Sequence, residues 1–139
     1  MLCYFWPMNI QVAVLCDAAT ETNGKLSLLG AFDTICTQQL PQCSIALRMK
    51  FDSVEEGKHS LKLNFVDEDG KLLITIDRQV DVVMPEDSHF ITSNFIVSIQ
   101  QLKFEKPGHY SIDLTLDGRL ETSIPLMVKY SQHSLGIES

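Results

Sequence analysis

The sequence predicts an all-β protein: a two-sheet antiparallel β-sandwich of immunoglobulin-like architecture with about eight strands. Apolar and polar residues alternate with a period of two over most of the chain, which is typical of strands with one buried face. Short polar turns join these segments, and no segment combines helical spacing of apolar residues with helix caps. The Cys…Trp…Cys pattern of antibody domains is absent, so the architecture follows from the strands and not from a motif.

The alternation sets the position of each expected strand. The first strand begins just after Met8, and its inward residues are expected to be Ile10, Val12, Val14 and Cys16. The others are expected near residues 25–35, 43–51, 61–65, 72–82, 90–100, 110–116 and 120–128. In the fifth of these strands, the residues expected to face inward are Leu72, Ile74, Ile76, Val80 and Val82.

Two positions interrupt the regular strands. The alternation of the second strand slips near Gly30, which predicts a β-bulge because glycine tolerates the backbone that a bulge requires. Pro125 cannot donate a ladder hydrogen bond. The last strand is therefore expected at a sheet edge, at least around Pro125.

Three glycines mark expected hairpin turns: Gly24, Gly70 and Gly118. Directly opposed residues in a sheet share a face, so the parity of the apolar positions predicts each register. Between the fourth and fifth strands, this argument pairs Phe65 with Leu72 across a four-residue loop closed by Gly70 at positive φ. Between the last two strands it pairs Leu114 with Leu120 across a three-residue loop that ends at Gly118, again at positive φ.

The chain of 139 residues suits one domain, which is expected at residues 8–130. Met1–Pro7 is apolar and aromatic, but it is far shorter than the roughly 20 apolar residues that span a bilayer, and it lacks the pattern of a signal peptide. We interpret it as an extension upstream of a natural start at Met8. The alternative is a hydrophobic arm that docks on this chain or on a neighbour. Residues 131–139 have no periodicity and are expected to form a flexible C-terminal tail.

Charge and cysteine usage disfavour several classes of protein. The net charge is −7 and no cluster of lysine and arginine occurs, so we expect neither nucleic acid nor a membrane as a partner. The cysteines form no C-x-x-C pair, although Cys36 and Cys43 flank one loop and could approach each other. Without an export signal, we expect a cytoplasmic protein with reduced thiols.

The sequence contains no recognisable constellation for catalysis. There is no G-x-S-x-G elbow, phosphate-binding loop or dinucleotide fingerprint, and the histidines are scattered without metal-ligand spacing. We therefore expect no enzymatic activity, no catalytic residues, no dedicated metal motif and no cofactor. The acidic run Asp67–Gly70 does not fit an EF-hand loop, because Phe65 and Ile76 occupy the first and last ligand positions. It is interpreted as a hairpin turn.

Two segments resemble a known family. VAVLCDAATETNGKLSLLGAFDTI, at residues 12–35, contains a G-K-L-x-x-L-G-x-F-D motif, and LKFEKPGHYSIDLTLDGRLETSIPLMV, at residues 102–128, contains a P-G-x-Y strand and a D-G turn. Together they are similar to a family of small prokaryotic proteins known only as a domain of unknown function. The resemblance implies a β-sandwich, and it supports the extension interpretation because members usually begin near Met8. It implies no reaction, ligand or catalytic residue.

Two features leave alternatives open. Asp17 and Asp33 stand at strand ends within the first motif, where they either contact a ligand or satisfy local turn amides. Residues 88–101 contain no Asp, Glu, Lys or Arg. This segment forms either a central strand covered on both faces or a sheet edge that pairs with another subunit, since uncharged edges recruit partners.

Acidic residues are expected to gather at one end of the sandwich. If the strands alternate in direction, the connections after the first, third, fifth and seventh strands share one end. They carry Asp17, Glu21, Asp52, Glu55, Glu56, Glu86, Asp87 and Asp117. Such an acidic pole either holds a calcium ion between several loops, receives a basic partner, or only keeps the protein soluble.

These observations favour a non-enzymatic binding or assembly module. Its partner is expected to be an unidentified protein or a second copy of this chain. The alternative function is a divalent-cation-binding domain that holds calcium at the acidic pole.

Overall fold

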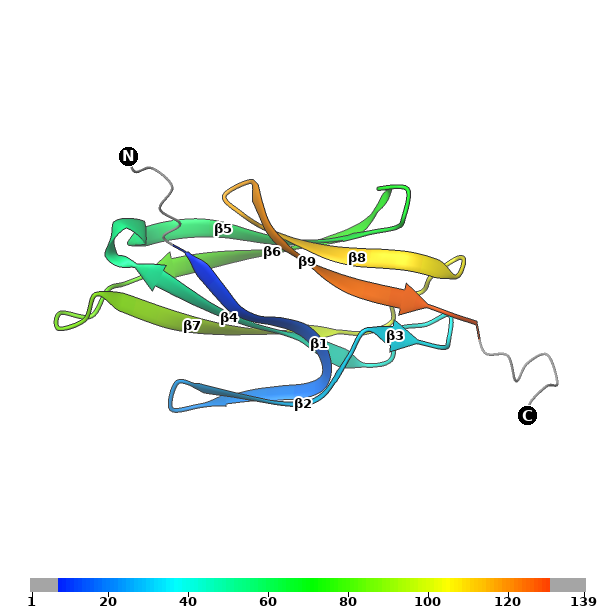
Figure 1. The fold of residues 1–139 in the computed structure, drawn as a ribbon, viewed down its shortest axis with the longest axis horizontal. Coiled ribbons are helices and arrows are strands. Elements are labelled where there is room, and N and C mark those ends of the chain that lie inside the picture. Colours follow the sequence, from blue (N-terminus) through cyan, green and yellow to red (C-terminus); the bar gives the residue numbers. More distant parts are fainter. Residues whose placement is uncertain (1–7, 131–139) are drawn as a thin grey trace.

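The computed structural model describes residues 8–130 and shows an all-β protein of two sheets packed as a sandwich (Figure 1). Met1–Pro7 and residues 131–139, the expected extension and tail, lie outside the described residues. Sheet A has the order β2-β1-β4-β7 and contains β1 (Asn9–Thr22), β2 (Lys25–Phe32), β4 (Cys43–Asp52) and β7 (Phe90–Ile99). Sheet B has the order β3-β9-β8-β5-β6 and contains β3 (Thr34–Ile35), β5 (Gly57–Val66), β6 (Leu72–Val82), β8 (Gly108–Leu116) and β9 (Arg119–Val128). A short 3₁₀ helix, η1 (Ser53–Glu55), follows β4.

The strand pairing is antiparallel except at β3, which runs parallel to β9. This short strand was not expected from the alternation, because two residues are too few to show a period. β3 pairs with β9 only at Met127 and Val128. The free side of β9 is therefore unpaired at Pro125, which lies opposite Ser111 of β8. The edge position expected for Pro125 is confirmed.

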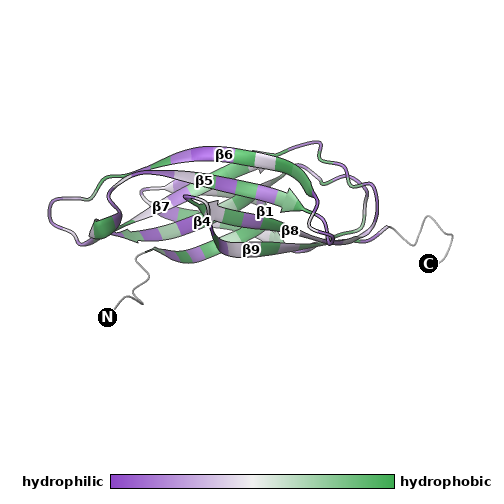
Figure 2. Cartoon of the chain, turned by 90° about the horizontal axis from the view of Figure 1, so that it is seen from above, coloured by the Kyte–Doolittle hydropathy of each residue, from purple (hydrophilic) through white to green (hydrophobic). Residues whose placement is uncertain are grey.

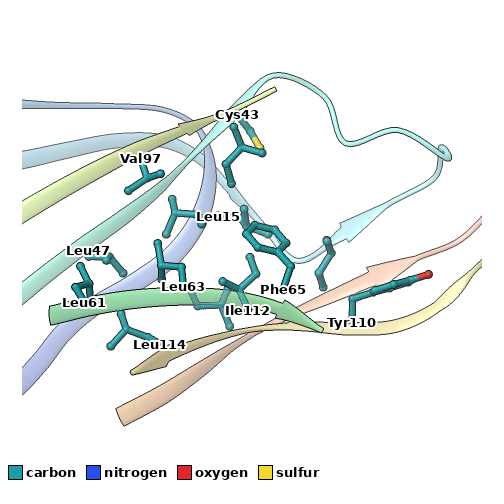
Figure 3. Packing of buried hydrophobic residues seen from close by; sticks show 14 of the residues in the cluster. Leu15, Cys43, Leu47, Leu61, Leu63, Phe65, Val97, Tyr110, Ile112 and Leu114 are labelled. Carbon is teal, nitrogen blue, oxygen red and sulfur yellow. The ribbon is translucent and has the colours of Figure 1, made fainter. Parts of the chain in front are cut away.

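The inner faces of the two sheets meet in one apolar core (Figure 3). Hydrophobic and hydrophilic residues alternate along the strands that form it (Figure 2). Buried side chains come from both sheets: Leu15, Cys43, Leu47 and Val97 from sheet A, and Leu61, Leu63, Phe65, Tyr110, Ile112 and Leu114 from sheet B. Each buried leucine or phenylalanine contributes about 1.5–3 kcal/mol relative to an exposed one, so this core supplies the main stabilisation of the fold.

β1 does not remain in one plane. Its first part pairs with β4 as far as Cys16, and its second part pairs with β2. The strand bends where its pairing with β4 ends, after Cys16, and the hairpin of β1 and β2 folds back beneath β4 and β7 as a third layer (Figure 1). Gly30 stands level with Asp17 at this bend with φ of +66°, and a Cβ atom there would collide with the Asp17 carboxylate. The β1–β2 register is the same on both sides of Gly30, so the predicted bulge is wrong.

The tip of this hairpin is anchored on the outer face of sheet A. The Arg48 guanidinium donates a hydrogen bond to the carbonyl oxygen of Gly24 (3.1 Å), and the Asn94 amide donates to the same oxygen (3.1 Å). Asn94 also donates to the Glu21 carboxylate (3.2 Å). Arg48 is held in place by further hydrogen bonds to Gln11 (3.0 Å) and Asn94 (2.9 Å). These contacts fix the hairpin across β4 and β7.

The third layer explains why β4 is buried on both faces. Ser44 and Ala46 alternate with the core residues of β4 and therefore point away from the core, yet both are buried. Cys16, which lies opposite Ser44, has no exposed surface. Leu26 and Leu28 of β2 are half-buried at alternate positions, as expected for side chains that face this covered surface.

The inward face of β1 differs from the expectation. A β-bulge between Ile10 and Val12 shifts the register against β4 by one residue. Ala13 and Leu15 consequently pack against the core, and the even-numbered residues from Val12 to Cys16 point the other way. The predicted inward set is right for Ile10 and wrong for the rest, because an inserted residue reverses every side chain after it.

The turn between β5 and β6 also contains a bulge. Gly70 and Gly118 have the expected positive φ, both at +83°, and the turn residue Gly24 has φ of +79°. However, Phe65 lies opposite Ile74 and not Leu72, because the register shifts between Phe65 and Val66. Leu72 and Ile74 were expected to face inward, but they are 53% and 36% exposed because β6 is the outermost strand of sheet B.

The turn between β8 and β9 resolves the parity conflict differently from the prediction. Leu114 lies opposite Thr122 and not Leu120, because a bulge directly after Leu114 absorbs the extra residue. The connection itself is a two-residue turn in which Asp117 and Gly118 both have positive φ, at +53° and +83°. This is the backbone of a type I′ turn, whose twist matches that of the flanking strands.

Replacing Gly118 with valine should destabilise the protein by about 1–2 kcal/mol, because a β-branched residue is strained at positive φ. No atom lies within 4 Å of an added Cβ at this position, so the effect reports backbone strain and not a steric clash. Urea denaturation measures the change. Gly118→Asn is the control and should be clearly more stable than the valine variant, since asparagine tolerates this conformation. Equal stability of the two variants would contradict the assignment.

Replacing Arg48 with methionine should loosen the folded-back hairpin. Loss of its hydrogen bonds should cost about 1.4 kcal/mol in total, which corresponds to an about tenfold larger population of the open hairpin. Because Cys16 reacts only when the hairpin is open, its alkylation rate should rise by the same factor. The measurement is mass spectrometry after timed exposure to iodoacetamide, in chains whose Cys3 and Cys36 are replaced by serine. Arg78→Met, in exposed β6, is the matched control. An unchanged rate at Cys16 would show that Arg48 does not hold the hairpin.

Candidate functional site

Most of the predicted acidic pole lies at one end of the sandwich, which we call the acidic end. Phe90 lies opposite Asp52, and Gly57 lies opposite Val82, so the β4–β5 and β6–β7 connections lie at this end. The turn at Asp117 joins them through a backbone hydrogen bond to Ser60. The acidic end is formed by Asp52, Glu55, Glu56, Glu86, Asp87 and Asp117.

Asp17 and Glu21 do not belong to the acidic end, and their assignment to the pole is wrong. Asp17 follows Cys16, which pairs with Ser44 near the start of β4, whereas Asp52 ends that strand. Glu21 lies in the folded-back hairpin, against Asn94. The prediction failed because β1 continues past Asp17 and reverses direction, so its connection to β2 does not fall at a sandwich end.

Two carboxylates of the β4–β5 connection accept local hydrogen bonds. Glu55 accepts from the backbone N–H of Asp52 (3.1 Å), and Glu56 accepts from that of Met84 (3.1 Å). Within residues 8–130, no group of three or more His, Cys, Asp or Glu side chains is arranged to hold a metal ion. The calcium site expected at an acidic pole therefore has no convergent set of ligands in this part of the chain.

Other acidic residues singled out in the sequence also serve local turns. Asp33 accepts a hydrogen bond from the hydroxyl of Thr34 (3.0 Å). Asp67 accepts from the backbone N–H groups of Asp69 (2.9 Å) and Lys71 (2.8 Å), which agrees with its interpretation as a hairpin turn. Asp17, by contrast, is exposed beside Gly30 at the bend.

His59 is the central polar side chain of the acidic end and was not singled out from the sequence. It lies on β5, stacks on Phe51 with ring centroids 5.9 Å apart, and has a largely buried side chain. Its Nδ1 lies 2.6 Å from the Asp117 carboxylate, and its Nε2 lies 2.6 Å from the backbone carbonyl oxygen of Glu55. Asp117 also accepts from the backbone N–H of Ser60 (2.9 Å). We call this arrangement the His59 clamp.

The partners of the His59 clamp favour the imidazolium form. A carboxylate and a carbonyl oxygen are both acceptors, so both ring nitrogens must donate. Burial alone would lower the pKa of His59, but the hydrogen bonds to Asp117 and to the Glu55 carbonyl raise it above its ordinary value. The hydrogen bond from His59 lowers the pKa of Asp117. Burial raises the pKa of the Glu55 carboxyl.

The clamp joins β5 to the β4–β5 connection and to the β8–β9 turn. A general base needs a nitrogen within hydrogen-bond reach of the proton that it removes, and both nitrogens of His59 already have partners. A neighbouring hollow of about 310 Å³ is lined by Glu55, Asp117, Arg119 and Glu121. Arg119 donates to Glu121 (3.3 Å), so this hollow contains both signs of charge.

A second hollow, of about 250 Å³, lies between β1, the end of β2 and β9. Its lining is mainly apolar and includes Leu15, Phe32 and Ile124, with Asp33 as its acidic residue. Ligand pockets usually have roughly 300–1,000 Å³ and several convergent polar groups. This hollow therefore points to no particular ligand.

The uncharged segment at residues 88–101 forms β7, which is the outermost strand of sheet A. The interpretation as a central strand is wrong, because the segment lies at a sheet edge; its pairing with another subunit stays a prediction. One side of β7 pairs with β4 along ten residue pairs, and no other strand of the described chain pairs with its second side. The backbone groups on that side form a template for another strand.

Two stacked β-sheets, with no metal-ligand cluster in the described residues, define a small β-sandwich domain. The chain belongs to a family of unknown function, DUF6941, whose family model matches residues 11–129. This confirms the resemblance to a domain-of-unknown-function family. No curated protein matches the chain. None of the helical structure in residues 8–130 is long and apolar enough to cross a membrane.

Replacing Asp117 with asparagine should reduce the pH dependence that the His59 clamp gives to stability, because the hydrogen bond from His59 to the Glu55 carbonyl remains. A raised pKa means that the folded state holds the proton more tightly, so the stabilisation is full below the ordinary histidine pKa of about 6.5 and is lost as pH rises through the folded value. We expect the variant to be less stable by about 1 kcal/mol at about pH 5.5, a value reduced for the exposure of Asp117, and by less at about pH 9.

Urea denaturation at several pH values measures this difference in free energy of unfolding. Asparagine keeps an oxygen that accepts from the Ser60 N–H, so the variant tests the interaction with His59 and not the turn itself. Asp87→Asn, at the same acidic end, is the matched control and should show no such pH dependence. If the free energies of unfolding of the Asp117 variant and the original chain differed by the same amount from about pH 5.5 to about pH 9, a protonated His59 in the clamp would be contradicted.

Proposed function

We propose that this protein is a non-enzymatic binding and assembly module in the cytoplasm, and that it recruits an extended segment of a protein partner to the free edge of β7. The observation that supports the proposal is a sheet edge without charged residues. An exposed edge presents unpaired N–H and C=O groups, and natural proteins usually protect such edges with charges, proline or bulges. β7 has none of these across its ten residues.

The outermost strand of sheet B provides a comparison within the same molecule. β6 carries Asp77, Arg78 and Asp81, all exposed. It also begins beside the bulge at Phe65 and Val66. The two edges therefore differ in the features that prevent association, and β7 is the unprotected one.

Immunoglobulin-like architecture is part of the proposal and is supported by the strand order. In the immunoglobulin fold, strands A, B, E and D form one sheet, and C, F and G form the other. Here β1, β4 and β7 occupy the places of A, B and E, while β5, β8 and β9 occupy those of C, F and G. No strand of the described chain takes the place of D beside E. The position next to β7 is therefore the one that this architecture would fill.

The cytoplasmic assignment is supported by the cysteines. Cys16, Cys36 and Cys43 are free thiols. Burial raises the pKa of Cys16 and raises that of Cys43 to about 11, so neither is a reactive thiolate at neutral pH. Such thiols suit a reducing compartment.

Strand addition should be detectable with an uncharged extended peptide. The probe is a ten-residue peptide of alternating threonine and valine, added up to about millimolar concentration and followed by amide chemical shifts. We expect shifts at β7 amides, including those of Thr92 and Ser98, and none along β6. The double variant Thr92→Lys, Ser98→Lys should lose them, because inserted lysines protect an edge.

The control variant is Gln79→Lys, which places the same charge on the exposed part of β6. It should bind the peptide as the original chain does. Absence of shifts at β7, or equal shifts in the double lysine variant, would contradict the proposed function.

A further inference from the structure

We infer that the strand added at β7 is β7 of a second copy of this chain, paired antiparallel about a two-fold axis beside Phe95. The inference rests on the proposed function and names the partner. Two four-stranded sheets would thereby become one continuous sheet. Antiparallel pairing of identical strands is the isologous contact that closes a dimer.

Side-chain parity restricts the registers of such a pair. The odd-numbered residues Ile91, Phe95 and Val97 face the core, whereas Asn94 faces the folded-back hairpin. Directly opposed residues of a continuous sheet share a face, so odd positions must meet odd positions. The two-fold axis then passes beside one residue, which lies directly opposite the same residue of the second copy. Near the middle of β7 that residue is Asn94, Phe95 or Ile96.

The charges that flank β7 select Phe95. Glu86 and Asp87 precede the strand and Lys103 follows it, and all three are exposed. The residues between them include no Asp, Glu, Lys or Arg. With Phe95 at the axis, Asp87 of each copy lies level with Lys103 of the other copy. In a parallel arrangement, Glu86 and Asp87 of the two copies would lie side by side and repel each other. Charge therefore favours the antiparallel pair.

The same register covers apolar side chains that the single chain leaves half-exposed. Ile91 and Phe95 pack against the core but are only partly buried. In this register, Phe95 lies opposite Phe95 of the second copy, and Ile91 lies opposite Ile99 of the second copy. Aromatic and β-branched pairs of this kind stabilise neighbouring strands. On the other face, Thr92 lies opposite Ser98 of the second copy.

Disulfide trapping tests this register. Thr92→Cys and Ser98→Cys are made separately in a chain whose Cys3 and Cys36 are replaced by serine, so that the remaining native thiols are buried. Opposed residues have Cα atoms about 4.5–5.5 Å apart, which is within disulfide range. After mild oxidation, a mixture of the two variants should yield about tenfold more linked dimer than either variant alone, because pairing raises the local thiol concentration.

Light scattering of the unmodified chain completes the test. Edge pairing buries less than a standard interface of roughly 1,600 Å², so the dimer should be weak and should dissociate on dilution. The Thr92→Lys, Ser98→Lys variant should be monomeric, and Gln79→Lys should still dimerise. A monomer at every concentration up to about millimolar, or equal linking of each cysteine variant alone, would overturn the inference. The threonine–valine peptide decides the proposed function separately, since it binds β7 whether or not the chain pairs with itself.

Discussion

The sharp bend of β1 at Asp17 determines how the rest of sheet A is arranged. Without it, the second half of the 14-residue strand would extend beyond the sandwich. The bend instead lays the hairpin over β4, so Ser44 and Ala46 can be small and buried on the face that a two-layer sandwich would expose. Small side chains allow a second backbone to approach closely. The hydrogen bonds of Arg48 and Asn94 to Gly24 then satisfy the backbone at the hairpin tip.

The acidic end uses its charge for structure. Glu55, Glu56 and Asp117 each accept hydrogen bonds from backbone or histidine donors that would otherwise be unsatisfied at strand ends. His59 completes the set between two acceptors, which favour its protonated form. A partly buried ionic group is costly unless it is fully hydrogen-bonded, and here each ring nitrogen has a partner. Glu55, Glu56 and Asp117 therefore have structural roles in these loops.

The sequence predicts the sandwich, the edge position of Pro125 and the positive φ of the turn glycines, because each depends on local chemistry or on a period of two. It does not predict the registers. An inserted residue reverses the parity of everything after it, and nothing in the composition at Gln11, Val66 or Thr115 marks the insertion. The bend at Asp17 could not be predicted for a similar reason. A glycine at position 30 is compatible with a β-bulge and equally with the close approach of another side chain, here that of Asp17. The importance of His59 could have been inferred, because it continues the odd-numbered inward phase of Leu61 and Leu63, where a polar ring needs partners.

The short parallel strand β3 has a consequence for the size of any assembly. It pairs only with the end of β9, and along the rest of that side Pro125 cannot donate a hydrogen bond to a further strand. The opposite side of the same sheet ends in charged β6. A pair formed through β7 uses the uncharged edge of both copies. The isologous contact closes that edge, whereas a sandwich joined head to tail through two different edges could add subunits indefinitely and form fibrils.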